Sequence, residues 1–169
     1  LKRSVNEGPF KGMHYIDEAH VGFVCHKLTG TYEKEIQHII EQELKIPYDV
    51  VIDVGSAEGY YAVGMALFSK AKKIISFEGS EKGRSLQNKL VLLNNVSDKI
   101  LIKEYCDENL LFQEMSSSDS ILIICDVDGY EWALLDNKLN PKLNTASMII
   151  ECHNHCYDEM ESDLVERFS

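Results

Sequence analysis

The chain has 169 residues, of which 44% are hydrophobic, and a formal net charge of -11. Such a chain can bury one sizeable core, so we expect a single globular domain rather than two. Its acidic residues are spread along the whole length and would repel a nucleic-acid backbone, so no nucleic-acid partner is expected. No apolar run approaches the roughly 20 residues that span a bilayer, and the start of the chain lacks the apolar core of a signal peptide, so no membrane partner is expected.

The cysteines indicate a reducing compartment. There are five of them, an odd count. Three lie within or beside strongly apolar segments, where reduced cysteine behaves as a small hydrophobic residue. We therefore expect a cytoplasmic protein. The sequence does not indicate an oligomeric state.

The N-terminal segment, residues 1–30, mixes Gly, Pro, His and aromatic residues without a period. It is expected to be irregular, with a short strand over 20–28. His14 and Tyr15 are expected to lie in an ordinary surface loop of this segment, rather than in a lid over a site.

From Thr31 onward, helices and strands alternate. A helix of about 13 residues begins there and ends before Pro47, because its apolar residues recur at three and four positions. Five apolar runs rich in Ile and Val predict strands buried on both faces, at residues 49–55, 73–79, 99–105, 120–129 and 147–153. Between these strands, apolar residues again recur at three and four positions and predict helices over residues 60–71, 80–95, 107–115 and 129–139. The pattern predicts an α/β domain over 31–169, with a doubly wound, mostly parallel sheet and helices on both faces.

A glycine turn joins the first of these strands to the next helix. Gly55 and Gly59 bracket it, and residues without a side chain let a nucleotide-like ligand approach the backbone N–H groups. The dinucleotide fingerprint is incomplete, since Ala57 stands at its second glycine. Glu58 also brings a carboxylate to where a pyrophosphate would sit, which disfavours an NAD-dependent oxidoreductase. A ligand with a positively charged end would suit Asp53.

Acidic residues also end the following strands, where ligands of such sheets bind. Glu78 ends the second strand and is placed to accept hydrogen bonds from the hydroxyls of a ribose. Asp107 follows Cys106 after the third strand and is placed to accept from an exocyclic amine such as that of adenine. Tyr60 opens the helix after the glycine turn, where its ring can stack near such a ligand.

The ordered stretches VVIDVGSAEGYYAVG, FEGS, YCDE and DVDGYE resemble the S-adenosylmethionine-dependent methyltransferases of the Rossmann-like class I, specifically the FkbM-type family. The resemblance runs from about Thr31 to His153. It implies S-adenosylmethionine as the cofactor, with its methyl group near Asp126. The implied cofactor-binding residues are Asp53, Gly55, Ser56, Ala57, Gly59 and Tyr60 around the methionine part, Glu78 and Gly79 at the ribose, and Cys106 and Asp107 at the adenine.

Two departures from the family pattern stand out. The family's D-x-E-G-x-E motif reads Asp126-Val-Asp128-Gly-Tyr-Glu131 here, with a shorter acid at its middle position. The family's sheet also ends in antiparallel sixth and seventh strands, which residues 157–169 do not supply. We expect either a domain truncated at its C-terminus or a sheet without these two strands.

Methyl transfer to a hydroxyl requires in-line alignment and removal of the hydroxyl proton by a base or a metal. Asp126 and Asp128 share one side of a strand end, as do Glu151 and His153 on the neighbouring strand. We therefore predict Asp126, Asp128 and His153 as catalytic residues, and Mg or Mn bound by Asp126, Asp128 and Glu151. The alternative is that Asp128 and Glu131 cap the following helix and that Glu151 accepts backbone N–H bonds. Zinc at residues 152–156 is disfavoured, because ligands so closely spaced cannot all turn to one ion.

The predicted function is O-methylation of a small molecule or of a sugar hydroxyl. Two alternatives remain, namely an NAD-dependent oxidoreductase on a degenerate Rossmann fingerprint and a non-catalytic cofactor-binding module. Trp132, the only tryptophan, is expected to pack in the core.

Overall fold

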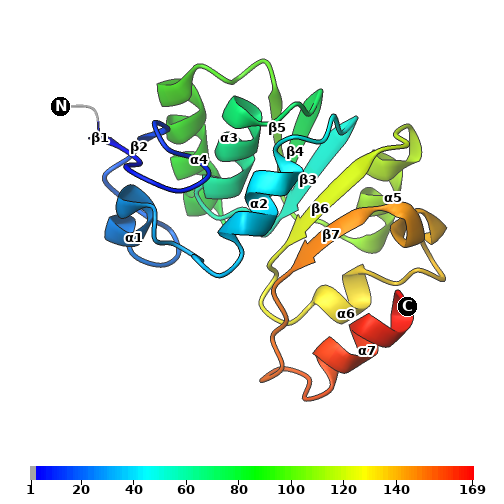
Figure 1. Ribbon diagram of the computed structural model, residues 1–169. Helices are drawn as coiled ribbons and strands as arrows, with labels where there is room; N and C mark the ends of the chain where they lie inside the picture. Colours follow the sequence, from blue (N-terminus) through cyan, green and yellow to red (C-terminus); the bar gives the residue numbers. More distant parts are fainter. Residues whose placement is uncertain (1–2) are drawn as a thin grey trace.

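The computed structural model describes residues 3–169 and contains a five-stranded parallel sheet at its centre (Figure 1). The strand order is β5-β4-β3-β6-β7. Every neighbouring pair in this sheet is parallel, which confirms the predicted α/β, doubly wound fold. The strands are β3 (Val50–Val54), β4 (Lys73–Phe77), β5 (Ile100–Lys103), β6 (Ile121–Cys125) and β7 (Ser147–Ile150).

Helices cover both faces of this sheet (Figure 1). One face carries α2 (Gln37–Glu43), α3 (Tyr60–Phe68) and α4 (Glu81–Asn94). The other carries α5 (Glu108–Ser116), α6 (Glu131–Leu134), a 3-10 turn at Pro141–Thr145 and α7 (Met160–Arg167).

Alternation along the strands divides the apolar side chains between two cores. On β3, Val51 belongs to the core under α3, whereas Val50, Ile52 and Val54 belong to the core under α5 and α7. The same alternation directs Asp53 to the α3 face, where it is 3% exposed. An acid is thereby built into a strand that is otherwise apolar.

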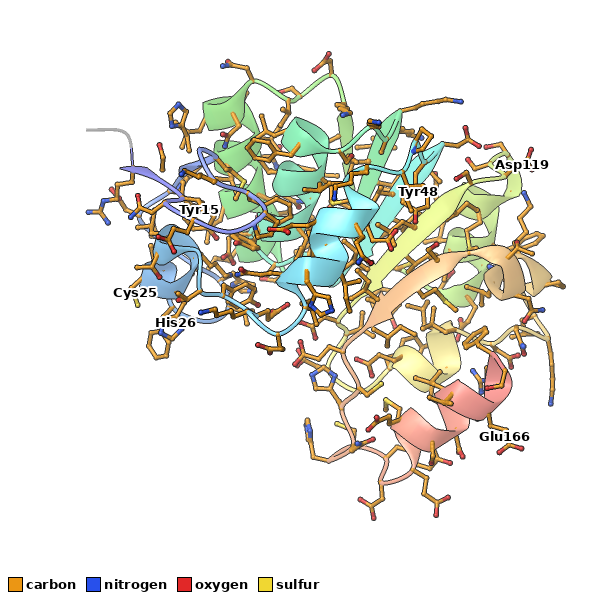
Figure 2. The ribbon with its side chains drawn as sticks, viewed as in Figure 1. Tyr15, Cys25, His26, Tyr48, Asp119 and Glu166 are labelled. Atoms are coloured by element: carbon orange, nitrogen blue, oxygen red, sulfur yellow. The ribbon has the colours of Figure 1, made fainter. Side chains whose placement is uncertain are left out.

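The N-terminal segment is more ordered than predicted. A two-stranded antiparallel pair forms from β1 (Arg3–Ser4) and β2 (His14–Tyr15). The strand expected over 20–28 is wrong, because Val24–Thr29 form helix α1, which Gly30 ends in the left-handed conformation at φ 78°. The surface loop expected for Tyr15 is also wrong, since this side chain is 2% exposed. In Figure 2 it lies inward, whereas Cys25 and His26 lie on the outside of α1.

Two helices are shorter than their apolar spacing predicts, and local contacts explain both. The helix expected from Thr31 begins only at Gln37, because Glu33 has a left-handed backbone with φ 44° that a helix cannot contain. The helix expected over 129–139 is limited to α6. Beyond it the Asp136 side chain accepts the Lys138 N–H at 2.8 Å and stabilises a turn instead.

The segment after β7 adds a helix to the fold rather than a strand. In the described part of the chain, no sixth or seventh strand joins this sheet, so β7 forms one of its edges. The residues after it lead into α7, whose Met160 and Leu164 are buried in the second core. Among residues 3–169, no helix is long and apolar enough to cross a membrane.

Candidate functional site

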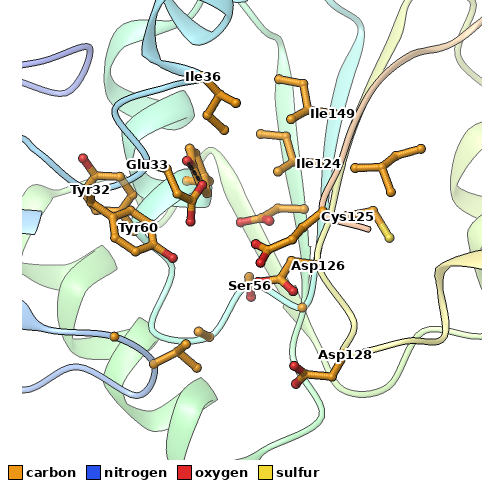
Figure 3. A pocket seen from close by; sticks show the side chains of 18 of the residues that line it. Tyr32, Glu33, Ile36, Ser56, Tyr60, Ile124, Cys125, Asp126, Asp128 and Ile149 are labelled. Atoms are coloured by element: carbon orange, nitrogen blue, oxygen red, sulfur yellow. Dashed lines mark hydrogen bonds between the residues drawn. The ribbon is translucent and has the colours of Figure 1, made fainter. Parts of the chain in front are cut away.

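A cavity of about 560 Å³ opens at the carboxyl ends of β3, β6 and β7 (Figure 3). Strand order reverses here, between β3 and β6, which is where ligands bind in open α/β sheets. Its wall is formed by the glycine turn, the ends of β6 and β7, and the segment that precedes α2. The acidic side chains around it are Glu33, Glu35, Asp53, Asp126, Asp128 and Glu151.

The glycine turn has the backbone geometry that the sequence predicts. Gly55 has φ 82°, and a Cβ atom there would lie 1.6 Å from the carbonyl oxygen of Asp126. The ends of β3 and β6 therefore approach so closely that only glycine fits. Gly59 precedes α3 with φ 88°. Ala57 has φ 50°, a strained value for a residue with a side chain.

Glu58 does not face this cavity, and the argument that it opposes a pyrophosphate is wrong. Its carboxylate is 0% exposed and forms an ion pair with Lys27 of α1. It also accepts from the Tyr15 hydroxyl at 2.6 Å and from the His20 N–H at 2.8 Å. Burial alone would raise the pKa of Glu58, but Lys27 and these hydrogen bonds outweigh it and hold the pKa below its ordinary value.

This ion pair fixes the N-terminal segment to the glycine turn. Lys27 is 2% exposed and also donates to the Val21 carbonyl at 2.9 Å. Val21 and Gly22 in turn line the cavity. The position of the cavity wall at 21–22 therefore depends on a buried charge pair formed 31 residues apart in sequence.

Asp53 is the most perturbed acid of the cavity. Its pKa is raised to about 7, chiefly by burial and also by the charges of Asp126, Glu78 and Glu33, while a hydrogen bond from the Ala62 N–H favours the charged form and lowers it. Its Oδ2 atom has no hydrogen-bond partner among the described residues. A buried carboxylate oxygen without a partner is costly unless a ligand satisfies it.

His153 brings the predicted acids of β6 and β7 together. Its Nε2 lies 3.6 Å from Asp126, 3.7 Å from Asp128 and 3.9 Å from Glu151. The pKa of Asp126 is raised to about 6, first by burial and then by the charge of Glu151. Burial and Glu33 raise the pKa of Glu151 in the same way. The three acids predicted to converge with His153 therefore lie around one nitrogen of its imidazole.

The other nitrogen of this imidazole is held by Glu131. Nδ1 of His153 lies 2.8 Å from Glu131 Oε1, and the same oxygen accepts the N–H groups of Val127 at 3.0 Å and Gly129 at 3.3 Å. Glu131 is 0% exposed. Partial burial would lower the pKa of His153, but Glu131, followed by Asp126 and Glu151, raises it above its ordinary value. Glu131 therefore stabilises the turn after β6 and also orients the imidazole.

Three of these residues could hold a metal ion. Ligand atoms of Asp126, Asp128 and His153 all lie within 4.8 Å of one another, and no cysteine of the described chain joins this group. Glu151, a predicted ligand, lies beside the group on β7. The donor set is two or three carboxylates and one imidazole, which suits Mg or Mn better than zinc.

A second, smaller cavity of about 180 Å³ adjoins the first. Gly55 and Asp128 line both cavities. The smaller one is also lined by Phe77, Gly79, Tyr105, Cys106 and Tyr130. A ligand longer than either cavity can therefore extend across Gly55 from one into the other.

Three predicted cofactor residues are engaged within the protein. Glu78 accepts the N–H groups of Ala57 and Ser80, each at 2.7 Å. Asp107 caps α5 by accepting the Leu110 N–H at 2.8 Å and lines neither cavity. Ser56 lines the larger cavity, but its hydroxyl belongs to a buried network and accepts from Ser76 at 2.6 Å.

Sequence reasoning missed the wall that precedes α2. Tyr32, Glu33 and Ile36 line the larger cavity opposite β6, and the Tyr61 hydroxyl donates to Glu33. The helical spacing of the apolar residues concealed this wall, because it predicted a continuous helix from Thr31. Trp132 also differs from a plain core residue, since Arg167 stacks over its ring at 3.3 Å from the centroid.

No protein-family model and no curated protein matches this chain. Many solved structures resemble this chain, among them the following three. Precorrin 8W decarboxylase of Methanobacterium thermoautotrophicum aligns with a TM-score of 0.60 and 13% identity, over 89% of this chain and 77% of its own. TYW2 of P. horikoshii in complex with MeSAdo aligns with a TM-score of 0.53 and 19% identity, over 93% of this chain and 55% of its own.

The O-methyltransferase of Bacillus cereus in complex with SAH aligns with a TM-score of 0.51 and 16% identity, over 79% of this chain and 58% of its own. This chain spans about half the length of most solved structures that it resembles. At these identities the likeness shows the fold, which is the Rossmann-like fold of methyltransferases.

Proposed function

We propose that this chain is an S-adenosylmethionine-dependent methyltransferase of the FkbM type that methylates a hydroxyl of a small molecule. The observation that carries the proposal is the pair of cavities that meet at Gly55, at the switch point of a methyltransferase fold. The smaller cavity, lined by Phe77, Tyr105 and Tyr130, suits an aromatic base such as adenine. In the larger cavity, the unpartnered oxygen of Asp53 suits the ammonium of a methionine part.

The other cofactor residues follow from this placement. Gly55, Ser56, Ala57, Gly59 and Tyr60 surround the methionine part, at the N-terminus of α3. Glu78 and Gly79 are assigned to the ribose, where the two oxygens of Glu78 retain lone pairs beyond the backbone N–H groups they accept. Cys106 lines the adenine cavity. Asp107 contacts the adenine only if it gives up its cap on α5, so we rank it last.

His153 is the proposed base. S-adenosylmethionine, when bound, supplies a methyl group activated by a sulfonium. The acceptor oxygen forms the new bond to the methyl carbon, the carbon–sulfur electron pair remains on sulfur, and the hydroxyl proton passes to Nε2 of His153. Asp126 and Asp128, at 3.6 and 3.7 Å from Nε2, stabilise the imidazolium that results.

The pH dependence of activity should report this base. His153 must be neutral to accept a proton, and Glu131 raises its pKa, so activity should rise with pH as the imidazole loses its proton. Glu131→Gln removes the negative charge, so the acid limb of the kcat profile should move to lower pH. The less firmly held ring should also reduce kcat by about 10-fold or more.

The control is Glu159→Gln, which replaces an exposed acid outside both cavities and should leave the profile unchanged. An acid limb at the same pH in Glu131→Gln and in the unaltered protein would show that His153 is not the base.

We also propose that Asp126, Asp128 and Glu151 bind Mg or Mn beside the acceptor hydroxyl, where the ion lowers the hydroxyl pKa. Chelation should then reduce the rate of methyl transfer, and added Mg or Mn should restore it. Asp128→Asn should abolish this restoration, whereas Asp98→Asn, an exposed acid outside both cavities, should retain it. Methyl transfer that is indifferent to chelation would end the metal proposal while leaving His153 as the base.

Incubation with methyl-labelled S-adenosylmethionine and a panel of hydroxylated small molecules tests the function as a whole. Transfer of label to an acceptor oxygen supports it. Tight S-adenosylhomocysteine binding without transfer to any acceptor would favour a non-catalytic module, a reading consistent with the absence of a sixth and seventh strand among residues 3–169. Cytoplasmic location remains a prediction from composition.

A further inference from the structure

The larger cavity has more negative charge than the proposed cofactor and metal can neutralise. Asp53 is assigned to the methionine ammonium, and Asp126 and Asp128 to the metal or to the imidazolium. With Glu151 also assigned to the metal, Glu33 and Glu35 remain, on the wall that precedes α2. Among residues 3–169, Lys27 is the only lysine that lines this cavity, and it is already paired with Glu58 and the Val21 carbonyl.

Glu33 is held in place for contact with a ligand. Its backbone has φ 44°, a strained value for glutamate, and the Tyr61 hydroxyl donates to its carboxylate. Its charge raises the pKa values of Asp53 in β3, Asp126 directly after β6 and Glu151 directly after β7. In Figure 3, Glu33 and Asp126 extend into the cavity from opposite sides.

A second observation points to a polar ligand group beside Glu33. Tyr60 lines the same cavity and is only 4% exposed, and its buried hydroxyl has no hydrogen-bond partner among the described residues. A buried hydroxyl is rarely left without a partner. Burial and the charge of Glu33 together raise its pKa to about 12, so the hydroxyl is neutral and available to a ligand.

The remaining wall is apolar. Ile36, Ile124 and Ile149 line the cavity between Glu33 and the end of β6. Such a wall suits the carbon skeleton of a small acceptor. A carboxylate or phosphate on that skeleton would meet Glu33 and Glu151 and be repelled by both.

We propose that the methyl acceptor carries a protonated amino group, which Glu33 and the Tyr60 hydroxyl bind while a hydroxyl of the same molecule faces His153. This inference rests on the proposed function. The amino group is an anchor and not the methylated atom, because an ammonium paired with a carboxylate keeps its proton and has no free electron pair. The acceptor class is therefore a hydroxylated primary amine, such as an amino sugar or a phenolic amine.

Binding titrations in the presence of saturating S-adenosylhomocysteine test this at pH 7, with two sets of probes of matched skeleton. One set is glucosamine, glucose and glucuronate, and the other is tyramine, 4-ethylphenol and 4-hydroxyphenylacetate. In at least one set the amine should bind 10-fold or more tightly than the neutral compound, and the carboxylate should bind least. Glu33→Gln should remove most of this preference, whereas Glu41→Gln, on the exposed side of α2, should retain it.

Three results would overturn the inference while leaving the proposed function intact. They are S-adenosylhomocysteine binding with no preference for the amine in either set, a preference for the neutral or acidic member, and an amine preference that Glu33→Gln does not change. Failure of S-adenosylhomocysteine itself to bind would reject the proposed function, and this inference with it.

Discussion

Lys27→Met should lower the free energy of unfolding by about 3–5 kcal/mol, because it leaves the carboxylate of Glu58 buried without its countercharge. Lys27 is 2% exposed and Glu58 is 0% exposed, so water cannot replace the lost ammonium. The hydrogen bonds from Tyr15 and His20 remain, but neither carries a charge. Urea denaturation of both proteins, followed by circular dichroism, measures the difference.

Two further variants separate loss of the pair from loss of a lysine. The double variant Lys27→Met/Glu58→Gln removes both charges and should recover a large part of the lost stability. Lys72→Met breaks the pair with Asp49 at 2.6 Å, but Lys72 is 73% exposed, so the change should cost far less stability than Lys27→Met. Equal destabilisation by Lys27→Met and Lys72→Met would contradict the role assigned to the buried pair.

Asp53→Asn should stabilise the protein above pH 7 and weaken its binding of S-adenosylhomocysteine. The folded-state pKa of Asp53 is about 7, above the ordinary value of 3.8. The contribution of the protonated Asp53 carboxyl to stability is therefore fully present below about pH 4. It is lost as the pH rises through about 7, because the buried carboxyl group must then ionise. Asparagine stays neutral, so the variant should be more stable by about 1–4 kcal/mol at pH 8.

The same change removes the proposed partner of the methionine ammonium. Loss of a charge-assisted hydrogen bond should weaken S-adenosylhomocysteine binding by about 10-fold or more. Asp98→Asn is the matched control and should change neither quantity, because Asp98 is exposed and lines neither cavity. A variant that is more stable at pH 8 and binds as tightly as the unaltered protein would show that Asp53 does not contact the cofactor.

The sheet could be predicted because its strands are short, apolar and regularly spaced. All five predicted strands are present, and the turn at Gly55 has the conformation that its residues require. The sequence also predicts that the acids after β6 and β7 lie close together, because residues two apart at a strand end share a side and parallel strands end at the same edge of the sheet. In the structure these residues lie just beyond β6 and β7, and the turn after β6, where Asp128 has φ 52°, completes their convergence on His153.

The N-terminal half of the site could not be predicted, because it depends on pairings that leave no periodic signal. Glu58 pairs with Lys27, 31 residues earlier. The place of Glu58 in the glycine turn suggests that it faces the ligand, but this pairing buries it instead. Glu33 lies in a left-handed turn within an apolar pattern that favours helix. Glu131 contacts His153 across 22 residues, and only the folded turn after β6 brings them together.

Calorimetric titration of this chain with S-adenosylmethionine, S-adenosylhomocysteine and NADH, in parallel, tests the central claim most directly. The two joined cavities and the free oxygen of Asp53 predict micromolar binding of the first two compounds and none of NADH. Binding of NADH with no response to either sulfur compound would contradict the assignment and favour an oxidoreductase. No binding by any of the three would show that the cavities of this chain do not form a cofactor site.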